Sequence, residues 1–179
     1  MSSTAELLDR NHRFAADFAD AGLPILPRLR TVILTCGDAR VDPAHVLGLE
    51  LGDAVVIRNN GGRVTPEVIQ EIAALTFLVS RMDGDTPGPF ELVLMQHTQC
   101  GAERFADPQL QRAMKAAIGV DVAPVAIVDH NASLQEDLER LRNARQVPDH
   151  VIVSAFLYDV ADGIAREVIA PAALRPTAR

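Results

Sequence analysis

Short apolar segments alternate with segments of helical periodicity along most of this 179-residue chain. Four mainly apolar runs have the length of buried strands, and three of them are rich in β-branched residues. These candidate strands are residues 31–36, 54–57, 91–97 and 150–158. Helices are predicted between them, because Asp42-Pro43 and Thr65-Pro66 place a capping side chain before a proline at the first helical position. Strands that alternate with helices favour an α/β fold with a mostly parallel central sheet flanked by helices.

The whole chain, residues 1–179, is predicted to form a single domain of ordinary size. Its first part, residues 1–28, is expected to be a helix and a connector, and residues 29–179 the α/β core. A capping box at Ser3 and Glu6 opens an amphipathic helix that extends up to Gly22. This helix packs either on its own domain or on a partner subunit, and its pattern allows both.

The second half of the chain is less regular. A capping box at Ser133 and Glu136 predicts a further helix. Residues 122–128 have the pattern of a strand but contain a proline, so their structure is ambiguous. Turn-forming residues at 159–163 are expected to fold the fourth strand back as a hairpin, which adds an antiparallel edge strand to the sheet. Residues 84–89 are interpreted as a surface loop.

Composition and charge narrow the possible functions. The net charge is −7 and the arginines are scattered, which argues against nucleic acid and anionic membranes as partners. No apolar run approaches the ~20 residues of a membrane span, and the first residues lack the features of a signal peptide. We therefore expect a cytoplasmic protein, in which its two cysteines are thiols or metal ligands rather than a disulfide.

Three of the predicted strands end in reactive or polar side chains. Cys36 ends the first strand, Arg58 and Asn59 end the second, and His97 ends the third with Cys100 just beyond it. Because the carboxyl ends of parallel strands lie at one edge of a sheet, these groups can converge although they are distant in sequence. Two thiolates and an imidazole are typical zinc ligands, and three protein ligands leave one position open, as in catalytic zinc sites.

The two cysteines also allow simpler interpretations than a metal site. A single buried cysteine is more often a core residue than a ligand, and a Cys36–Cys100 disulfide is a further alternative. A cysteine phosphatase would need an arginine six residues after Cys36, where this chain has Asp42. Asp38 and Arg40, placed beside the first cysteine, favour the metal site over these alternatives.

Three motifs together resemble the β-class carbonic anhydrases, in particular a short, archaeal-like subgroup. They are Cys36-x-Asp38-x-Arg40, the loop Arg58-Asn-Asn-Gly-Gly62 and His97-x-x-Cys100-Gly101. The resemblance implies an enzyme with one Zn²⁺ per subunit that hydrates carbon dioxide to bicarbonate and a proton by zinc-bound hydroxide. It also implies a homodimer or a dimer-based oligomer, an N-terminal helix that reaches over the neighbouring subunit, and a loop rather than a strand at residues 122–128.

The resemblance assigns roles to residues at the matching positions. Cys36, His97 and Cys100 resemble the zinc ligands, and Asp38 and Arg40 the catalytic dyad. Asp38 can either occupy the fourth zinc position or pair with Arg40, and pairing leaves that position free for water. A substrate-pocket loop is expected at residues Asn59, Gly61 and Gly62.

The sequence leaves the substrate open. Relatives with the same zinc ligands hydrolyse carbonyl sulfide or carbon disulfide, so a sulfur-analogue hydrolase is the main alternative. A non-catalytic zinc protein with Asp38 closing the site is the third hypothesis, which the intact Arg40 disfavours. Two positions depart from the family pattern: Asn60 replaces a small apolar residue, and Gln96 stands where glycine often precedes the histidine. His130 is interpreted as a loop residue, with a proton-relay pair to Asp129 as the alternative.

Overall fold

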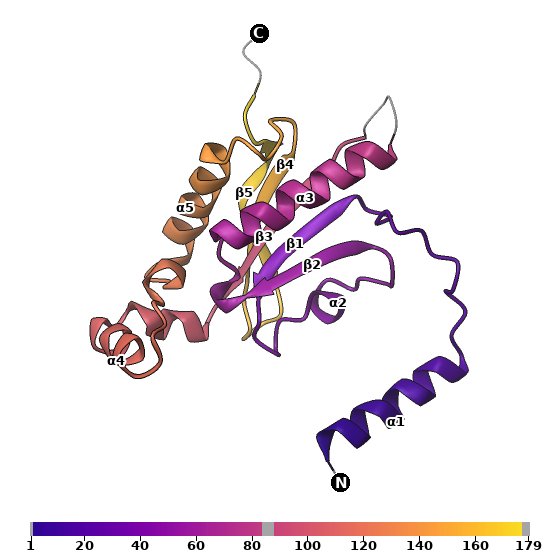
Figure 1. Ribbon diagram of the computed structural model, residues 1–179, viewed down its shortest axis with the longest axis horizontal. Helices are drawn as coiled ribbons and strands as arrows, with labels where there is room; N and C mark the ends of the chain where they lie inside the picture. The colour runs from indigo at the N-terminus through magenta and orange to yellow at the C-terminus, as the bar shows by residue number, and fades with distance from the viewer. Residues whose placement is uncertain (1, 84–87, 177–179) are drawn as a thin grey trace.

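A computed structural model, which describes residues 2–83 and 88–176, contains a five-stranded sheet in the order β2-β1-β3-β4-β5 (Figure 1). Its strands are β1 (Thr31–Cys36), β2 (Ala54–Asn59), β3 (Glu91–His97), β4 (Ile152–Tyr158) and β5 (Ala165–Ala173). The first four are parallel, and β5 pairs antiparallel with β4 at one edge. The predicted α/β class and the hairpin at the end of the chain are both confirmed.

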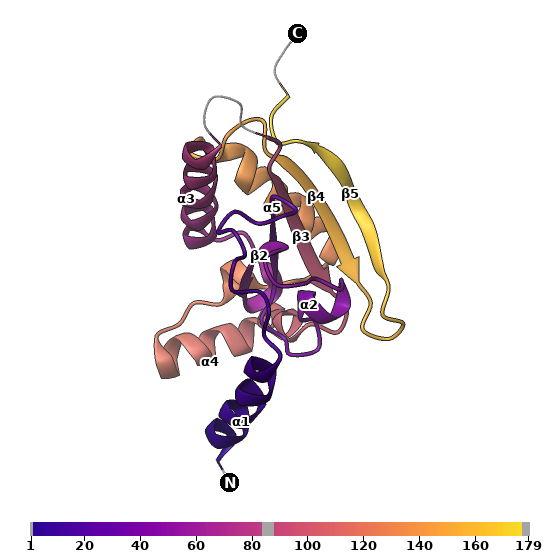
Figure 2. The ribbon, with the colours of Figure 1, turned by 90° about the vertical axis from the view of Figure 1, so that its right-hand side faces the viewer.

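Helices cover both faces of this sheet, and the larger core lies on one of them. The helices are α1 (Ser3–Ala16), α2 (Pro43–Val46), α3 (Pro66–Met82), α4 (Pro108–Ile118) and α5 (His130–Asn143). Figure 2 shows α3 and α5 on the same side, where buried residues such as Ile72 and Leu134 pack against Leu34 and Leu94 of the sheet. The short helix α2 packs through Val46 on the opposite face. Within the described part of the chain, no helix is long and apolar enough to cross a membrane.

The N-terminal helix is shorter than predicted and has no contact with the core. Ser2 rather than Ser3 caps α1, because its hydroxyl accepts the backbone N–H of Ala5, and the helix ends at Ala16 rather than near Gly22. None of its residues is buried, and it projects away from the sheet in both views (Figures 1 and 2). A helix without tertiary packing gains little from extension, which accounts for its early end.

Two assignments in the second half of the chain need correction. The helix predicted from the capping box at Ser133 begins earlier, because the carboxylate of Asp129 accepts the N–H of Ala132 at 2.8 Å and caps α5. His130 is therefore the first residue of a helix and not a loop residue. Residues 122–128 contain the short 3₁₀ helix η3 (Ala123–Val125) and no strand, as expected from the family resemblance. Of the predicted loop at 84–89, residues 84–87 lie outside the described residues.

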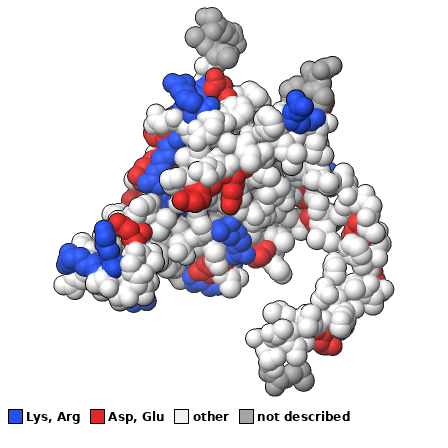
Figure 3. All heavy atoms as spheres, viewed as in Figure 1, with Lys and Arg blue, Asp and Glu red and all other residues white. Residues whose placement is uncertain are grey.

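Charged side chains are mixed on the surface. On the face drawn in Figure 3, lysine and arginine lie interspersed with aspartate and glutamate over the sheet and its helices. The face in this view therefore has no large field of one sign that would steer a polyanion toward it.

Candidate active site

The carboxyl ends of β1 and β3 bring two cysteines and a histidine together. Cys36 is the last residue of β1, His97 the last of β3, and Cys100 follows in the turn before the 3₁₀ helix η2 (Gly101–Ala106). Their ligand atoms all lie within 4.8 Å of one another, and all three residues are buried. The convergence predicted from parallel strand ends is thus present.

These three side chains fit a zinc ion. The two Sγ atoms are 3.7 Å apart and both cysteines are free, whereas two thiolates on one tetrahedral zinc lie about 3.8 Å apart, given Zn–S bonds of ~2.3 Å. Nδ1 of His97 donates to the carbonyl of Thr98 at 2.9 Å, which fixes the ring. Nε2 of His97 is buried and has no hydrogen-bond partner among the described residues. A free, oriented imidazole nitrogen beside two thiols is a metal-binding arrangement.

The electrostatics of the cluster favour ionisation of one of the two thiols. A hydrogen bond from Cys100 lowers the pKa of Cys36, against the opposing effect of burial. The same hydrogen bond, together with burial, raises the pKa of Cys100. Burial pushes the pKa of His97 down, but the adjacent Cys36 sulfur and the carbonyl of Thr98 outweigh burial and raise it. One thiol of the pair therefore ionises easily, as metal binding requires.

Asp38 and Arg40 form an ion pair at the edge of this cluster. Nη2 of Arg40 donates to Oδ2 of Asp38 at 2.7 Å, and Nε donates to Oδ1 at 3.0 Å. These bonds and the backbone N–H of Arg40 hold the pKa of Asp38 far below its usual range. Oδ2 of Asp38 also lies 3.9 Å from Nε2 of His97. An ionised carboxylate is thus held next to the position where a metal would bind, with both of its oxygens engaged by Arg40.

Backbone contacts attach the pair to both ligand-bearing segments. Arg40 donates a further bond to the carbonyl of Gln99, which lies between His97 and Cys100. Gln99 has a positive φ of 55°. Non-glycine residues with positive φ are uncommon and are retained where surrounding contacts hold them. Arg58 of β2 donates to the carbonyls of Cys36 at 3.0 Å and Asp38 at 2.6 Å. The sequence placed Arg58 at the site but did not identify this positioning role.

The glycine loop after β2 lets the chain pass close to the site. Gly61 and Gly62 have positive φ, and a Cβ at Gly62 would lie 2.9 Å from the backbone of Thr35 in β1. A Cβ at Gly61 would lie 3.0 Å from that of Ala102. Only glycine fits such approaches. The amide of Asn59 does not face the cavity, because it closes the loop by two bonds with the backbone of Arg63.

A small cavity of about 300 Å³ opens at the cluster. It is lined by Cys36, Gly37, Asp38, Asn60, Gly61, Gly101, Ala102 and Phe105. Of the pocket-loop residues predicted, Gly61 lines this cavity, whereas Asn60 was noted only as a departure from the family pattern. Phe105 and Ala102 were not predicted, because an aromatic or alanine in a short helix carries no signal of its own.

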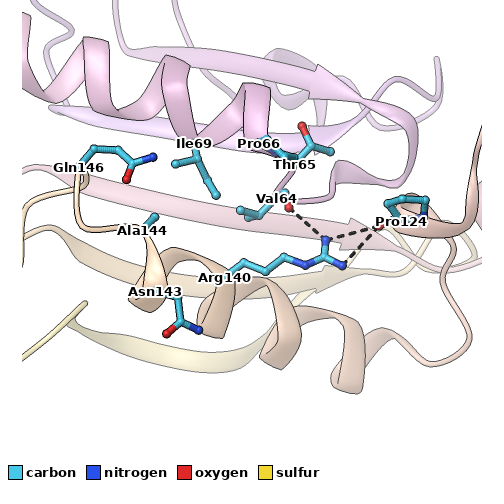
Figure 4. A pocket seen from close by; sticks show the side chains of 9 residues that line it. All are labelled: Val64, Thr65, Pro66, Ile69, Pro124, Arg140, Asn143, Ala144 and Gln146. Carbon is cyan, nitrogen blue, oxygen red and sulfur yellow. Dashed lines mark hydrogen bonds between the residues drawn. The ribbon is translucent and has the colours of Figure 1, made fainter.

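A larger cavity of about 580 Å³ lies elsewhere, between the start of α3 and the end of α5 (Figure 4). Its lining contains no cysteine, histidine or carboxylate. The guanidinium of Arg140 beside it donates to the carbonyls of Val64 at 3.0 Å and Pro124 at 3.4 Å, as the dashed lines show. Because this cavity offers no thiol, imidazole or carboxylate, the smaller one beside the cysteine–histidine cluster is the candidate active site.

Comparisons with known proteins agree with this assignment. A family model described as carbonic anhydrase matches residues 31–157. Beta-carbonic anhydrase 1 of Mycobacterium tuberculosis is 32% identical over 170 residues, covering 94% of this chain and 99% of the relative. A crystal structure of carbonic anhydrase from Streptococcus mutans has 34% identity and a TM-score of 0.78, covering 94% and 98% of the two chains. A carbon disulfide hydrolase of Saccharolobus solfataricus is 27% identical and covers 87% of this chain and 86% of the relative.

Proposed function

Because the chain belongs to the β-carbonic anhydrase family, we propose that it catalyses the reversible hydration of carbon dioxide to bicarbonate and a proton. One observation carries the proposal: a buried Cys36–His97–Cys100 cluster lies beside an ionised Asp38–Arg40 pair on a small cavity. Carbon dioxide is a poor electrophile toward neutral water, so its hydration needs a hydroxide near neutral pH. When bound, zinc supplies that hydroxide by lowering the pKa of water to ~7 in the best-known case.

The residues around the metal position have three separate roles: metal binding, hydrogen-bond acceptance and positioning of the acceptor. Cys36, His97 and Cys100 would hold the ion, and their three side chains leave a fourth position for water. Asp38 stays ionised beside that position and can accept a hydrogen bond from the attacking oxygen. Arg40 holds both carboxylate oxygens and so keeps Asp38 from occupying the fourth position itself. This arrangement supports a catalytic site over a non-catalytic zinc site closed by Asp38.

The cavity suits a small linear substrate. Its walls include the apolar side chains of Ala102 and Phe105 and the bare backbone of Gly61. Carbon dioxide has no net dipole, so an apolar wall beside a polar reacting centre holds the substrate and limits competing water. A bicarbonate product carries a charge, which the apolar wall does not compensate, and product release is thereby favoured.

Hydrolysis of carbonyl sulfide or carbon disulfide is the second candidate function. The relative from Saccharolobus solfataricus, a carbon disulfide hydrolase, supports it. The cavity of this chain contains the polar residue Asn60 next to its apolar wall. An amide at the cavity favours an oxygen-containing substrate over carbon disulfide, which has no oxygen to accept a hydrogen bond. This observation favours carbon dioxide over carbon disulfide, whereas carbonyl sulfide, which contains an oxygen, is distinguished by the turnover measurement below.

We also propose a homodimer in which α1 packs on the partner subunit. Leu7, Leu8 and Phe14 of this helix are exposed, although they form an apolar stripe. On the body of the protein, Phe77 and Met82 of α3 are exposed as well. Helices with an unburied apolar face gain their stability from packing on another surface. Sedimentation velocity of wild type and of Phe14→Asp tests the dimer: the variant is expected to sediment as a monomer, and an unchanged dimer would contradict the proposal.

Stopped-flow carbon dioxide hydration with zinc analysis of the same sample tests the proposed activity. We expect about one zinc per subunit and a rate that falls to the buffer background in Cys100→Ser. Lys115→Ala on the surface of α4 is the matched control and should keep the wild-type rate. A zinc-loaded wild type without hydration, but with turnover of carbonyl sulfide or carbon disulfide, would support the second function. Zinc without turnover of any of the three would support the non-catalytic alternative.

A further inference from the structure

His130, the first residue of α5, bridges the two segments that carry His97 and Cys100. Its Nδ1 lies 2.9 Å from Oε1 of Gln96, and its Nε2 lies 3.1 Å from Oε1 of Glu103. His130 is separated from these partners by 34 and 27 residues in sequence. A side chain with two long-range hydrogen bonds to two ligand-bearing segments is placed to control how these segments sit relative to each other.

The first contact holds the end of β3. Gln96 is completely buried and directly precedes the candidate ligand His97. An amide oxygen can only accept, so Nδ1 of His130 donates to it. The amide nitrogen of Gln96 has no partner among the described residues, which leaves His130 as the side chain that fixes this amide. A buried amide with one anchor is reoriented when that anchor is lost.

The second contact holds the turn at Cys100. The backbone N–H of Cys100 donates to Oε1 of Glu103 at 2.9 Å, the same oxygen that faces His130. Cys100 is the N-cap of η2, so its backbone position sets where its Sγ lies. The carboxylate of Glu103 thus transmits the position of His130 to the candidate ligand through one backbone bond.

The helix behind His130 is a rigid base for both contacts. The carboxylate of Asp129 caps α5, and Leu134 and Leu138 of the helix are buried in the main core. Groups that orient metal ligands from behind typically change metal affinity or activity by about 10- to 100-fold when removed. The motif His97-x-x-Cys100 includes none of Gln96, Glu103 and His130. His130 in addition lies on α5, which is distant in sequence from β3.

We propose that His130 is a positioning residue that, through Gln96 and Glu103, pre-orders His97 and Cys100 for zinc. The inference rests on the proposed zinc enzyme, but it concerns metal affinity rather than turnover. Without His130, zinc binding itself would have to order both ligand segments. The free-energy cost of that ordering should weaken zinc binding. The fold of the metal-free protein should depend on it less, since the core contacts of α5 remain.

Chelator competition on the folded protein measures this effect. We expect zinc affinity to fall about 10- to 100-fold in His130→Ala. His130→Asn can still donate from the position of Nδ1 to Gln96, and His130→Gln can still reach Glu103, so each should recover part of the loss. His150→Ala, an exposed histidine before β4, is the matched control and should keep wild-type affinity. The visible spectrum of the cobalt-substituted protein should change in His130→Ala and be partly restored in the two amide variants.

A double-mutant cycle separates positioning from a general loss of stability. If His130 acts through Glu103, the effects of His130→Ala and Glu103→Gln on zinc affinity should be less than additive. Wild-type zinc affinity in His130→Ala, or fully additive effects, would overturn the proposal. A fall in the unfolding free energy of the metal-free protein without a change in zinc affinity would also overturn it. A wild type that binds zinc but hydrates no carbon dioxide would instead contradict only the proposed function.

Discussion

Two arginine–aspartate pairs in this protein have the same contact distance but different surroundings. Arg40 lies 2.7 Å from Asp38 at the candidate active site, and Arg63 lies 2.7 Å from Asp137 in the interior. The side chain of Arg40 is 51% exposed, whereas that of Arg63 is 2% exposed. Arg63 also donates to the carbonyl of Ala126 and to Glu136, so it joins the segment after the glycine loop to α5.

The contrast shows that burial decides what such a pair does. A buried charge that loses its partner is left uncompensated at a large cost, so the Arg63–Asp137 pair is part of the fold. An exposed pair contributes at most about 1 kcal/mol to stability, so the Asp38–Arg40 pair can be altered without unfolding the protein. The role of the Asp38–Arg40 pair is to hold the carboxylate of Asp38 beside the candidate metal position. The two pairs should therefore separate stability from activity.

Arg63→Ala should cause the largest change in stability. Removal of Arg63 leaves the buried Asp137 with only its 3.2 Å contact to Arg140, and we expect the free energy of unfolding to fall by about 3–5 kcal/mol. Urea denaturation followed by far-UV circular dichroism measures the change. Arg40→Ala is the matched control and should lose at most about 1 kcal/mol. Equal losses in both variants would show that burial does not distinguish the pairs.

The pKa values of the two aspartates should be shifted in opposite directions. Hydrogen bonds from the side chain and backbone of Arg40 lower the pKa of Asp38, whereas burial raises the pKa of Asp137 against the opposing effect of Arg63. NMR titration of the carboxyl carbons should place Asp38 below and Asp137 above the ordinary value of about 3.9. Two values on the same side would contradict the comparison.

The signs of these shifts also set the pH dependence of stability. Because the pKa of Asp38 is depressed in the fold, its contribution is present above about pH 3.9 and is lost as pH falls through the folded-state pKa. The raised pKa of Asp137 acts the other way: its contribution is present below about pH 3.9 and is lost as pH rises through the folded-state pKa. In Arg40→Ala, the pKa of Asp38 should rise toward the ordinary value, and NMR titration of the variant measures the shift.

The larger cavity of Figure 4 gives the smallest expected effect. Asn143 and Gln146 line it and are exposed, so their replacement by alanine leaves no buried group without a partner. We expect each variant to keep the carbon dioxide hydration rate of wild type and to change the unfolding free energy by less than about 0.5 kcal/mol. A clear loss of hydration in either variant would mean that this cavity, and not only the smaller one, serves the reaction.

Much of the fold and of the site was predictable from local patterns. The strands that end at Cys36 and His97 are mainly apolar, and their parallel pairing brings both residues to one edge. Capping by Asp42 and Thr65 was confirmed, because each side chain accepts a backbone N–H at the start of its helix. Local signals were therefore sufficient for these strands and caps, but not for the capping boxes at Ser3 and Ser133.

Long-range contacts were not predictable in the same way. Arg63 and Asp137 are 74 residues apart, and no pattern in either segment indicates that they meet. The position of His130 was misassigned, since the stronger cap of α5 is Asp129 rather than Ser133. The lining of the cavity by Phe105 depends on how η2 packs after Cys100, which a local pattern does not specify. Tertiary geometry decides the Arg63–Asp137 pair and the cavity lining, whereas the cap of α5 is a local choice between Asp129 and Ser133.

The central claim is that Asp38 and Arg40 control a zinc position held by Cys36, His97 and Cys100. The most direct test is the carbon dioxide hydration rate of Arg40→Ala, measured by stopped flow on a sample with its zinc content determined. The account predicts about one zinc per subunit, a folded protein and a turnover reduced by about 10- to 100-fold, since Asp38 is then free to occupy the fourth position. Wild-type turnover, or a folded variant without zinc, would contradict it.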